Sequence, residues 1–100
     1  MENKEQQNQI QIELTDEIAQ GTYSNLAIIA HSTSEFIIDF VRIVPGVPKA
    51  KVKSRIILTP EHAKRLLFAL NDNIVKFEKQ NGTISVDNGT PSFPVVGGEA

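Results

Sequence analysis

The sequence predicts an α+β fold: a four-stranded antiparallel meander, followed by one long C-terminal helix packed on the sheet, in a chain that forms a dimer. Three observations support this prediction. Four short apolar runs are separated by turn-forming residues, a helix start signal stands at residues 59–61, and the apolar surface exceeds what one helix can cover. The chain has 100 residues, which leaves room for one core.

We expect one folded unit between two flexible ends. Residues 1–8 are polar without periodicity and predict a disordered N-terminal arm, because they offer too little apolar surface to offset the entropy of ordering the chain. Residues 82–100 contain repeated Gly and Pro and predict a flexible C-terminal tail. Residues 9–81 remain as a single α+β domain.

The first two strands are predicted from their apolar patterns. Residues 9–15 alternate apolar and polar side chains, which is typical of a strand with one exposed face. A connection that contains a turn of helix at residues 16–20 follows. Residues 25–31 are apolar at both alternating sets of positions, which indicates a central strand covered on two sides.

The third and fourth strands flank a Pro-rich turn. Residues 36–44 are apolar on both faces and end at the Pro-Gly-Val-Pro sequence of residues 45–48, because Pro cannot donate a hydrogen bond to a neighbouring strand. Residues 50–58 form the fourth strand. Since the connections are short, the strands are expected to pair as an antiparallel meander.

The helix has the clearest local signal. Thr59 can cap the exposed backbone N–H groups, Pro60 suits the first helical position, and Glu61 favours the positive end of the helix dipole. Gly82 suits the position just after the last turn. One apolar stripe follows the helix at steps of three and four residues: Ala63, Leu66, Leu67, Leu70, Ile74 and Phe77.

More apolar surface is present than one chain can cover. One helix covers one face of a small sheet, whereas the two middle strands are apolar on both faces, and the helix carries a second apolar seam. We therefore expect a homodimer with two-fold symmetry. The candidate interface residues are Ile37, Val41, Ile43, Phe68 and Val75. The alternative is that the C-terminal tail folds back over the second face of the sheet.

A cluster of cations marks the fourth strand and the start of the helix. Residues 49–65 have a net charge of +5 and residues 1–17 a net charge of −4, in a chain whose total is −2. The candidate basic patch consists of Lys49, Lys51, Lys53, Arg55, Lys64 and Arg65. It would bind phosphate backbones or an acidic protein surface. The alternative, which we favour, is a solvated edge strand whose lysines prevent aggregation. No aromatic residue lies between these cations, so nucleic acid is a less favoured partner.

Few residues suggest chemistry. Asp39 stands in an apolar row and can share a face with Arg55, so the two are expected to form a structural ion pair. The chain has no Cys, and His31 and His62 lack the spacing of metal ligands. We expect no catalytic residue, no metal, no cofactor and no small-molecule substrate. Without an apolar stretch long enough for a signal peptide or a membrane span, the expected location is the cytoplasm, with no membrane contact.

Several short motifs over residues 10–82 resemble a small uncharacterised prokaryotic family, domain of unknown function three-four-six-seven. They are Tyr23-x-Asn25, Phe36-x-x-Asp39-Phe40, Arg55, Pro60-x-x-Ala63-Lys64-x-Leu66-Leu67, Phe77-Glu78 and Gly82. Phe77 stands where this family would have Tyr. The resemblance implies a bacterial protein without an established activity, and it suggests the transcription apparatus as a setting, since such genes neighbour those of the large RNA polymerase subunits. In architecture the chain is more loosely similar to the export chaperone SecB.

These observations favour a non-enzymatic protein-binding or assembly module that works as a homo-oligomer, in association with the transcription apparatus. The first alternative is electrostatic nucleic-acid binding through the basic patch, which predicts an affinity that falls with salt. The second is a SecB-like holdase chaperone, which would hold unfolded chains on its uncovered apolar face.

Overall fold

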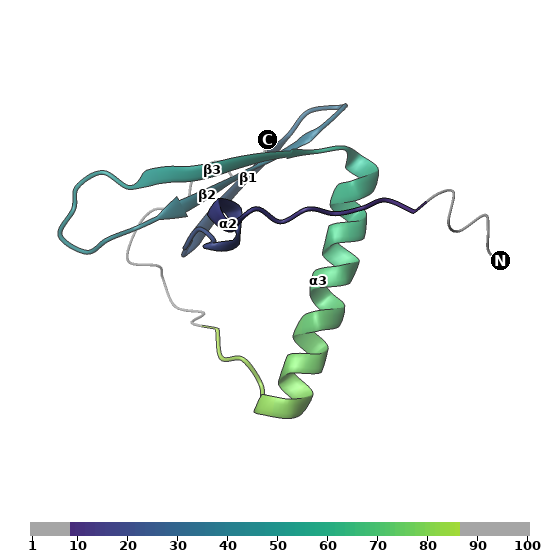
Figure 1. Cartoon of the computed structure of the whole chain (residues 1–100). Helices are drawn as coiled ribbons and strands as arrows, with labels where there is room; N and C mark the ends of the chain where they lie inside the picture. Colours follow the sequence, from purple (N-terminus) through teal and green to yellow (C-terminus); the bar gives the residue numbers. More distant parts are fainter. Residues whose placement is uncertain (1–8, 87–100) are drawn as a thin grey trace.

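A three-stranded antiparallel sheet followed by a long C-terminal helix forms the body of the chain (Figure 1). The structure is a computed structural model and describes residues 9–86. Along the chain, its elements are α2 (Asp16–Ala19), β1 (Leu26–His31), β2 (Phe36–Arg42), β3 (Lys51–Leu58) and α3 (Pro60–Asn81). The α+β fold class is confirmed. The predicted disordered arm at residues 1–8 and most of the predicted tail lie outside the described residues.

The sheet has the strand order β1-β2-β3, so β2 is central, and among the described residues β1 and β3 each have a free edge. Each pairing is antiparallel, as expected from the short connections. Ser32 N–H donates to the carbonyl of Glu35 at 2.9 Å in the first turn. The second turn uses Gly46 at φ +84°, a conformation that favours glycine. The prediction that residues 25–31 form a central strand is therefore wrong within this chain, where β1 is an edge strand.

Asn25 extends the pairing of β1 with β2 by a side-chain bridge. Its Nδ2 donates to the carbonyl of Ile43 at 3.0 Å, and its Oδ1 accepts from Ile43 N–H at 2.8 Å. The backbone N–H of Asn25 also donates to the carbonyl of Val41 at 3.0 Å. An amide side chain has both a donor and an acceptor, so it can replace a backbone pair at the end of the ladder.

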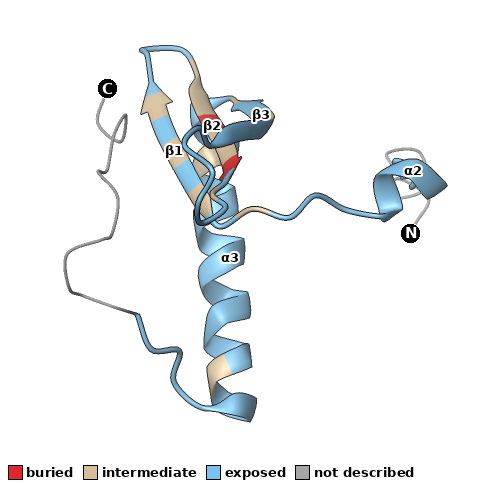
Figure 2. Ribbon diagram, turned by 90° about the vertical axis from the view of Figure 1, so that its left-hand side faces the viewer, coloured by how far each residue is buried: buried red, intermediate tan, exposed pale blue. Residues whose placement is uncertain are grey.

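The helix α3 begins and ends as its local sequence predicts. The Thr59 side chain accepts a hydrogen bond from His62 N–H at 3.1 Å, and Pro60 stands in the first turn. At the other end, Gly82 has φ +90° and donates its N–H to the carbonyl of Glu78. Figures 1 and 2 show that α3 leaves the end of β3 and that its later turns project past the sheet. The expected packing on the sheet is therefore confined to the first half of the helix.

The core of the described chain is very small. Its buried hydrophobic residues are Ile38 and Val41, both on β2, with 9% and 3% of their surface exposed. Figure 2 shows these two positions in red on the central strand, and the rest of the ribbon is intermediate or exposed. None of the residues of α3 is buried. Most of the apolar stripe that predicted the helix is therefore exposed in the described part of the chain.

Over residues 9–86 the structure has three strands where four were predicted. Residues 9–15 form no strand, and Ile10, Ile12 and Leu14 are 80%, 90% and 66% exposed. The prediction is wrong for a single chain because alternation specifies one apolar face but not a strand to pair with. The expected turn of helix is confirmed as α2, whose first turn is capped by the Thr15 side chain.

Candidate functional site

An apolar groove lies between the sheet and the first half of α3. It has a volume of about 350 Å³. Its walls are Ala27 and Ile29 of β1, Phe36, Ile38 and Phe40 of β2, Leu58 of β3, and Ala63, Leu66, Leu67 and Leu70 of α3. Because every one of these side chains is apolar, the groove is suited to apolar side chains of another protein segment.

The sheet register explains why these residues share one face. Phe36, Ile38 and Phe40 alternate along β2 and therefore point to the same side. Their partners on β1 and β3 lie on that side as well: Ile29 is opposite Ile38, and Leu58 is opposite Phe36. The helix then begins two residues after Leu58, so its apolar stripe faces the groove from the start.

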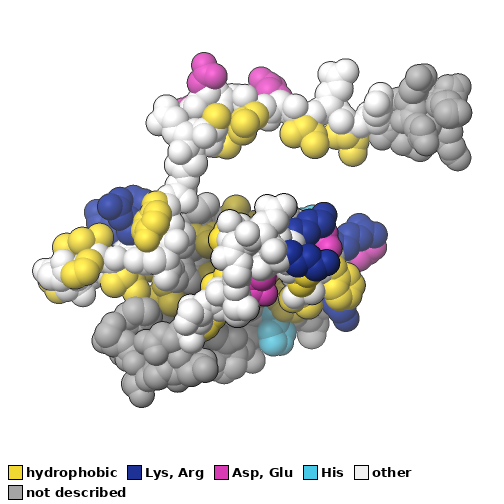
Figure 3. Space-filling view, turned by 90° about the horizontal axis from the view of Figure 1, so that it is seen from below, with side chains coloured by type: hydrophobic (Ala, Val, Ile, Leu, Met, Phe, Trp, Pro, Cys, Tyr) yellow, Lys and Arg dark blue, Asp and Glu magenta, His cyan; other side chains and the backbone are white. Residues whose placement is uncertain are grey.

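The helix wall of the groove is only partly covered. Leu67 and Leu70 are 57% and 55% exposed. Beyond the groove, Ile74 and Phe77 continue the same stripe and are also exposed. In Figure 3, which shows the molecule from below, hydrophobic side chains are exposed on the body and along the N-terminal segment at the top of the picture. An apolar surface of this extent is typical of an interaction site.

The structure separates the predicted interface residues into three groups by exposure. Phe68 and Val75 lie on α3 and are exposed, with Lys64 Nζ 6.0 Å from the centre of the Phe68 ring. Ile37 and Ile43 are half-buried. Val41 is buried within its own chain and therefore lies on no surface that a partner could reach. Sequence reasoning gave less weight to the groove face of α3, which holds more exposed apolar residues than Phe68 and Val75.

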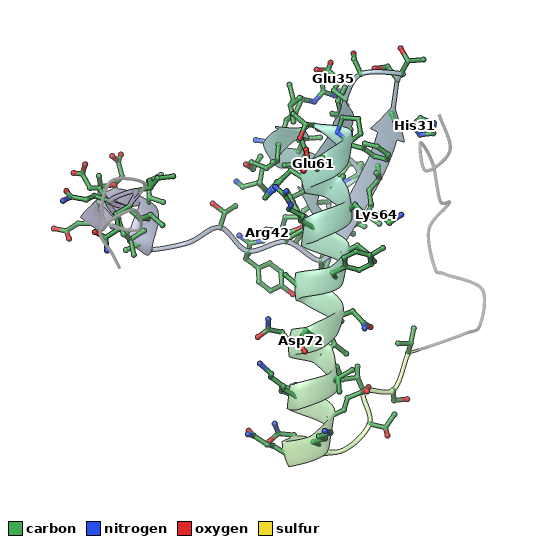
Figure 4. All side chains as sticks on the ribbon, turned by 90° about the vertical axis from the view of Figure 1, so that its right-hand side faces the viewer. His31, Glu35, Arg42, Glu61, Lys64 and Asp72 are labelled. Carbon is green, nitrogen blue, oxygen red and sulfur yellow. The ribbon has the colours of Figure 1, made fainter. Side chains whose placement is uncertain are left out.

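The predicted basic patch is divided in the same way. Lys49, Lys51 and Lys53 lie together with Arg42 around a shallow hollow of about 220 Å³. The other predicted members are Arg55, which is bound to Asp39, Arg65, which is bound to Glu61 at 2.5 Å, and Lys64, which lies on α3. In Figure 4, Lys64 and Arg42 extend to opposite sides of α3. The three lysines and Arg42 therefore form a strand cluster separate from the helix cations.

Asp39 and Arg55 face each other across β2 and β3. Arg55 Nε donates to Asp39 Oδ1 at 2.6 Å, and Arg55 Nη2 donates to Asp39 Oδ2 at 2.8 Å. These two hydrogen bonds favour the ionised carboxylate, so Arg55 lowers the pKa of Asp39 below its ordinary value of 3.8. The same hydrogen bonds raise the pKa of Arg55. Because both groups are held in a bidentate pair, they stabilise the sheet register rather than offer a reactive group.

Two residues near the strand cluster were not predicted from the sequence. Arg42 adds a fourth cation, and its Cζ lies 5.8 Å from the centre of the Tyr23 ring. Arg42 is the last residue of β2 and precedes the turn, whereas the three lysines follow it. Only the pairing of β2 with β3 could therefore have shown that Arg42 belongs to the cluster. The bridging role of Asn25 was missed for the same reason, since its partner is eighteen positions away.

The histidines occupy separate surroundings. The ring of His31 stacks on that of Phe36, with centroids 5.4 Å apart. His62 lies in the first turn of α3. Within residues 9–86, no three His, Asp or Glu side chains are grouped closely enough to hold a metal ion. No helix in that part of the chain is long and apolar enough to cross a membrane.

Comparison with known proteins gives one finding. The model of a protein family described as "Protein of unknown function (DUF3467)" matches residues 1–86. No curated protein matches the chain. No solved structure matches it either.

Proposed function

The chain belongs to the DUF3467 family of proteins of unknown function, and from its groove we propose that it is a non-enzymatic protein-binding module that works as a homo-oligomer. The observation that supports this proposal is the ratio of covered to uncovered apolar surface. Two hydrophobic side chains of the described chain are buried, whereas seven large hydrophobic residues of α3 alone are exposed. A chain that leaves its longest helix uncovered gains little stability from that helix.

Self-association covers this surface most directly. Stable interfaces bury about 800 Å² on each partner and contain an apolar centre with a polar rim. The groove and the stripe of α3 supply the apolar centre, and Arg65 and Asp72 supply exposed charges on the same helix. A second copy brings the same surface, so one two-fold contact covers both.

A further protein partner would then bind the assembled oligomer. We place this partner in the transcription apparatus and the protein in the cytoplasm, following the gene neighbourhoods that the family resemblance suggests. Copurification of the full chain from bacterial cells at low and moderate salt tests this placement. RNA polymerase subunits among the retained proteins would support it, and the absence of any stable partner would contradict the binding function.

A matched pair of variants tests whether the groove is the interaction surface. Leu67→Asp places a charge in the groove, and Val47→Asp places the same charge in the β2–β3 turn at a comparably exposed position. Light scattering coupled to size exclusion is expected to give an oligomer for the wild type and for Val47→Asp, and a smaller mass for Leu67→Asp. Equal masses for all three proteins would show that the groove is not the contact.

A second candidate function is nucleic-acid binding through the strand cluster. The supporting observation is that Lys49, Lys51, Lys53 and Arg42 converge on one hollow without a carboxylate in its lining. Fluorescence anisotropy with a labelled duplex is expected to show an affinity that falls as salt rises, and that weakens when Lys51 and Lys53 become Glu. Binding that is insensitive to both changes would exclude this role.

A third candidate is holdase activity at the groove. Its apolar lining would hold exposed apolar segments of unfolded clients, as the architectural likeness to SecB suggests. Suppression of client aggregation by the wild type, and its loss in Leu67→Asp, would support it. Equal suppression by both proteins would contradict it.

A further inference from the structure

The described N-terminal segment, residues 9–15, has the alternating pattern of an amphipathic strand but pairs with no strand of the described chain. Its apolar residues Ile10, Ile12 and Leu14 are among the most exposed hydrophobic side chains of the described chain. In Figure 3, hydrophobic side chains lie along one side of the N-terminal part of the described chain, which includes α2, and carboxylates lie on its other side. We call residues 9–15 the N-terminal strand segment. It has the pattern of a strand with one buried face, yet none of residues 9–86 buries that face.

A short structured connection directs this segment away from its own sheet. Thr15 accepts hydrogen bonds from Ile18 N–H through its side chain and from Ala19 N–H through its carbonyl. Gly21 follows at φ +81°, which turns the chain. Figure 2 shows α2 standing well apart from the sheet. The segment is therefore presented outward by ordered local structure.

The free edge of β3 is a complementary acceptor. Since the strand order is β1-β2-β3, no strand of the described chain pairs with the backbone groups along the outer side of β3. Residues 49–55 carry four cations and no carboxylate, whereas the N-terminal strand segment carries Glu13 and no cation, and Asp16 and Glu17 follow it in α2. Two β3 edges would repel each other through their lysines, but an acidic strand would be attracted. The charges thus select the N-terminal strand segment over a second β3.

The faces of the two strands also match. Ser54, Ile56 and Leu58 of β3 lie opposite Phe40, Ile38 and Phe36, on the groove side of the sheet. Arg55 lies on the other side with Asp39. If Ile10, Ile12 and Leu14 continue the groove side, Glu13 falls on the same side as Arg55. One orientation therefore satisfies both the apolar and the charged positions.

We propose that the N-terminal strand segment of one copy adds as a fourth strand to the free edge of β3 in a second copy. This inference rests on the proposed homo-oligomer and specifies how its two chains meet. Backbone hydrogen bonds join the strands, and Ile10, Ile12 and Leu14 extend the wall of the partner's groove. Two-fold symmetry makes the exchange reciprocal, so each sheet gains the fourth strand that a single chain lacks.

Disulfide trapping between differently tagged full-length chains tests the exchange. The chain contains no Cys, so a disulfide that joins the two tags must link Ile12→Cys of one chain to the Cys placed in the other: Ser54→Cys, Ile56→Cys or Leu58→Cys. These three positions sample the registers that place Ile12 on the groove side. Paired strands hold opposite Cα atoms about 4.5–5.5 Å apart, which a disulfide accepts. We expect a disulfide-linked mixed dimer with one of the three.

Two control variants test whether the cross-link has the geometry of strand exchange. Gln11→Cys points to the opposite side of the segment and is expected to lose the cross-link. Ile29→Cys, on the free edge of β1, is expected to give none with Ile12→Cys. Three results would each overturn strand exchange. They are a cross-link that forms only within one chain carrying both Cys residues, a cross-link to β1, and no cross-link although the wild type is oligomeric.

Charge reversal gives an independent readout. Glu13→Lys is expected to raise the dissociation constant of the dimer by about twofold to fivefold for each exchanged segment. The double change Lys51→Glu and Lys53→Glu should raise it similarly, and the combined variant should recover wild-type affinity. If the wild type is monomeric, the proposed function itself fails. If the wild type is dimeric and the combined variant is no better than either parent, only the exchange fails.

Discussion

Truncation of Leu67 to Ala separates a helix covered by a partner from one exposed to solvent. Complete burial of a Leu side chain is worth about 1.5–3 kcal/mol. Leu67 is 57% exposed in the single chain, so truncation there removes about 1 kcal/mol of stability. If an oligomer covers α3, the same truncation leaves a cavity and costs about 2–5 kcal/mol. The two situations therefore differ by more than the error of the measurement.

Urea unfolding followed by far-ultraviolet circular dichroism is the assay, at several protein concentrations. Ala has the highest helix propensity, so the substitution itself does not weaken α3. Val47→Ala, at an exposed position in the β2–β3 turn, is the control and is expected to change stability by less than about 0.5 kcal/mol.

The concentration dependence completes this test. For an oligomer, the unfolding midpoint rises with protein concentration, because dissociation accompanies unfolding. If Leu67→Ala lowers the free energy of unfolding by about 1 kcal/mol or less, and the midpoints do not depend on protein concentration, the proposal that a partner covers α3 is refuted.

Three further predictions concern local contacts. Replacing Asp39 with Asn removes the bidentate pair with Arg55. Because the pKa of Asp39 in the folded protein lies below 3.8, the variant loses its full amount of stability above that pH, and the loss shrinks as the pH falls below it. Unfolding measured over a series of acidic pH values checks this, and a stability difference that grows in acid would contradict the pairing. Thr59→Ala removes the cap of α3 and is expected to cost about 1 kcal/mol by thermal unfolding, with Thr59→Ser close to wild type. Asn25→Ala removes two hydrogen bonds at the end of β1 and is expected to lower the free energy of unfolding by about 1–3 kcal/mol. Amide hydrogen exchange at Ile43 should become faster, and an unchanged exchange rate there would argue against the side-chain bridge.

The sequence predictions were most accurate where the signal depends only on neighbouring residues. The start of α3 was predicted from Thr59 and Pro60 because a helix cap depends on neighbouring residues alone. The three paired strands followed from short connections, which leave antiparallel pairing as the simple choice. The turn containing Gly46 was predicted because its Pro and Gly residues specify a turn locally.

The features that depend on distant contacts were predicted less well. Residues 9–15 have the alternation of a strand, but alternation carries no information about which edge, or which chain, provides the partner. Residues 25–31 have the composition of a central strand and lie at an edge. The participation of Arg42 in the strand cluster depends on the β2–β3 hairpin, which brings Arg42 opposite Lys51. Each miss concerns contacts with distant residues, which the local sequence does not specify.

Sedimentation equilibrium over a wide concentration range, with circular dichroism on the same samples, tests the need for a second chain most directly. We predict a mass of twice 11.0 kDa at high concentration and a loss of helical signal as dilution produces single chains. A mass of 11.0 kDa at every concentration, with the full helical signal retained, would contradict it.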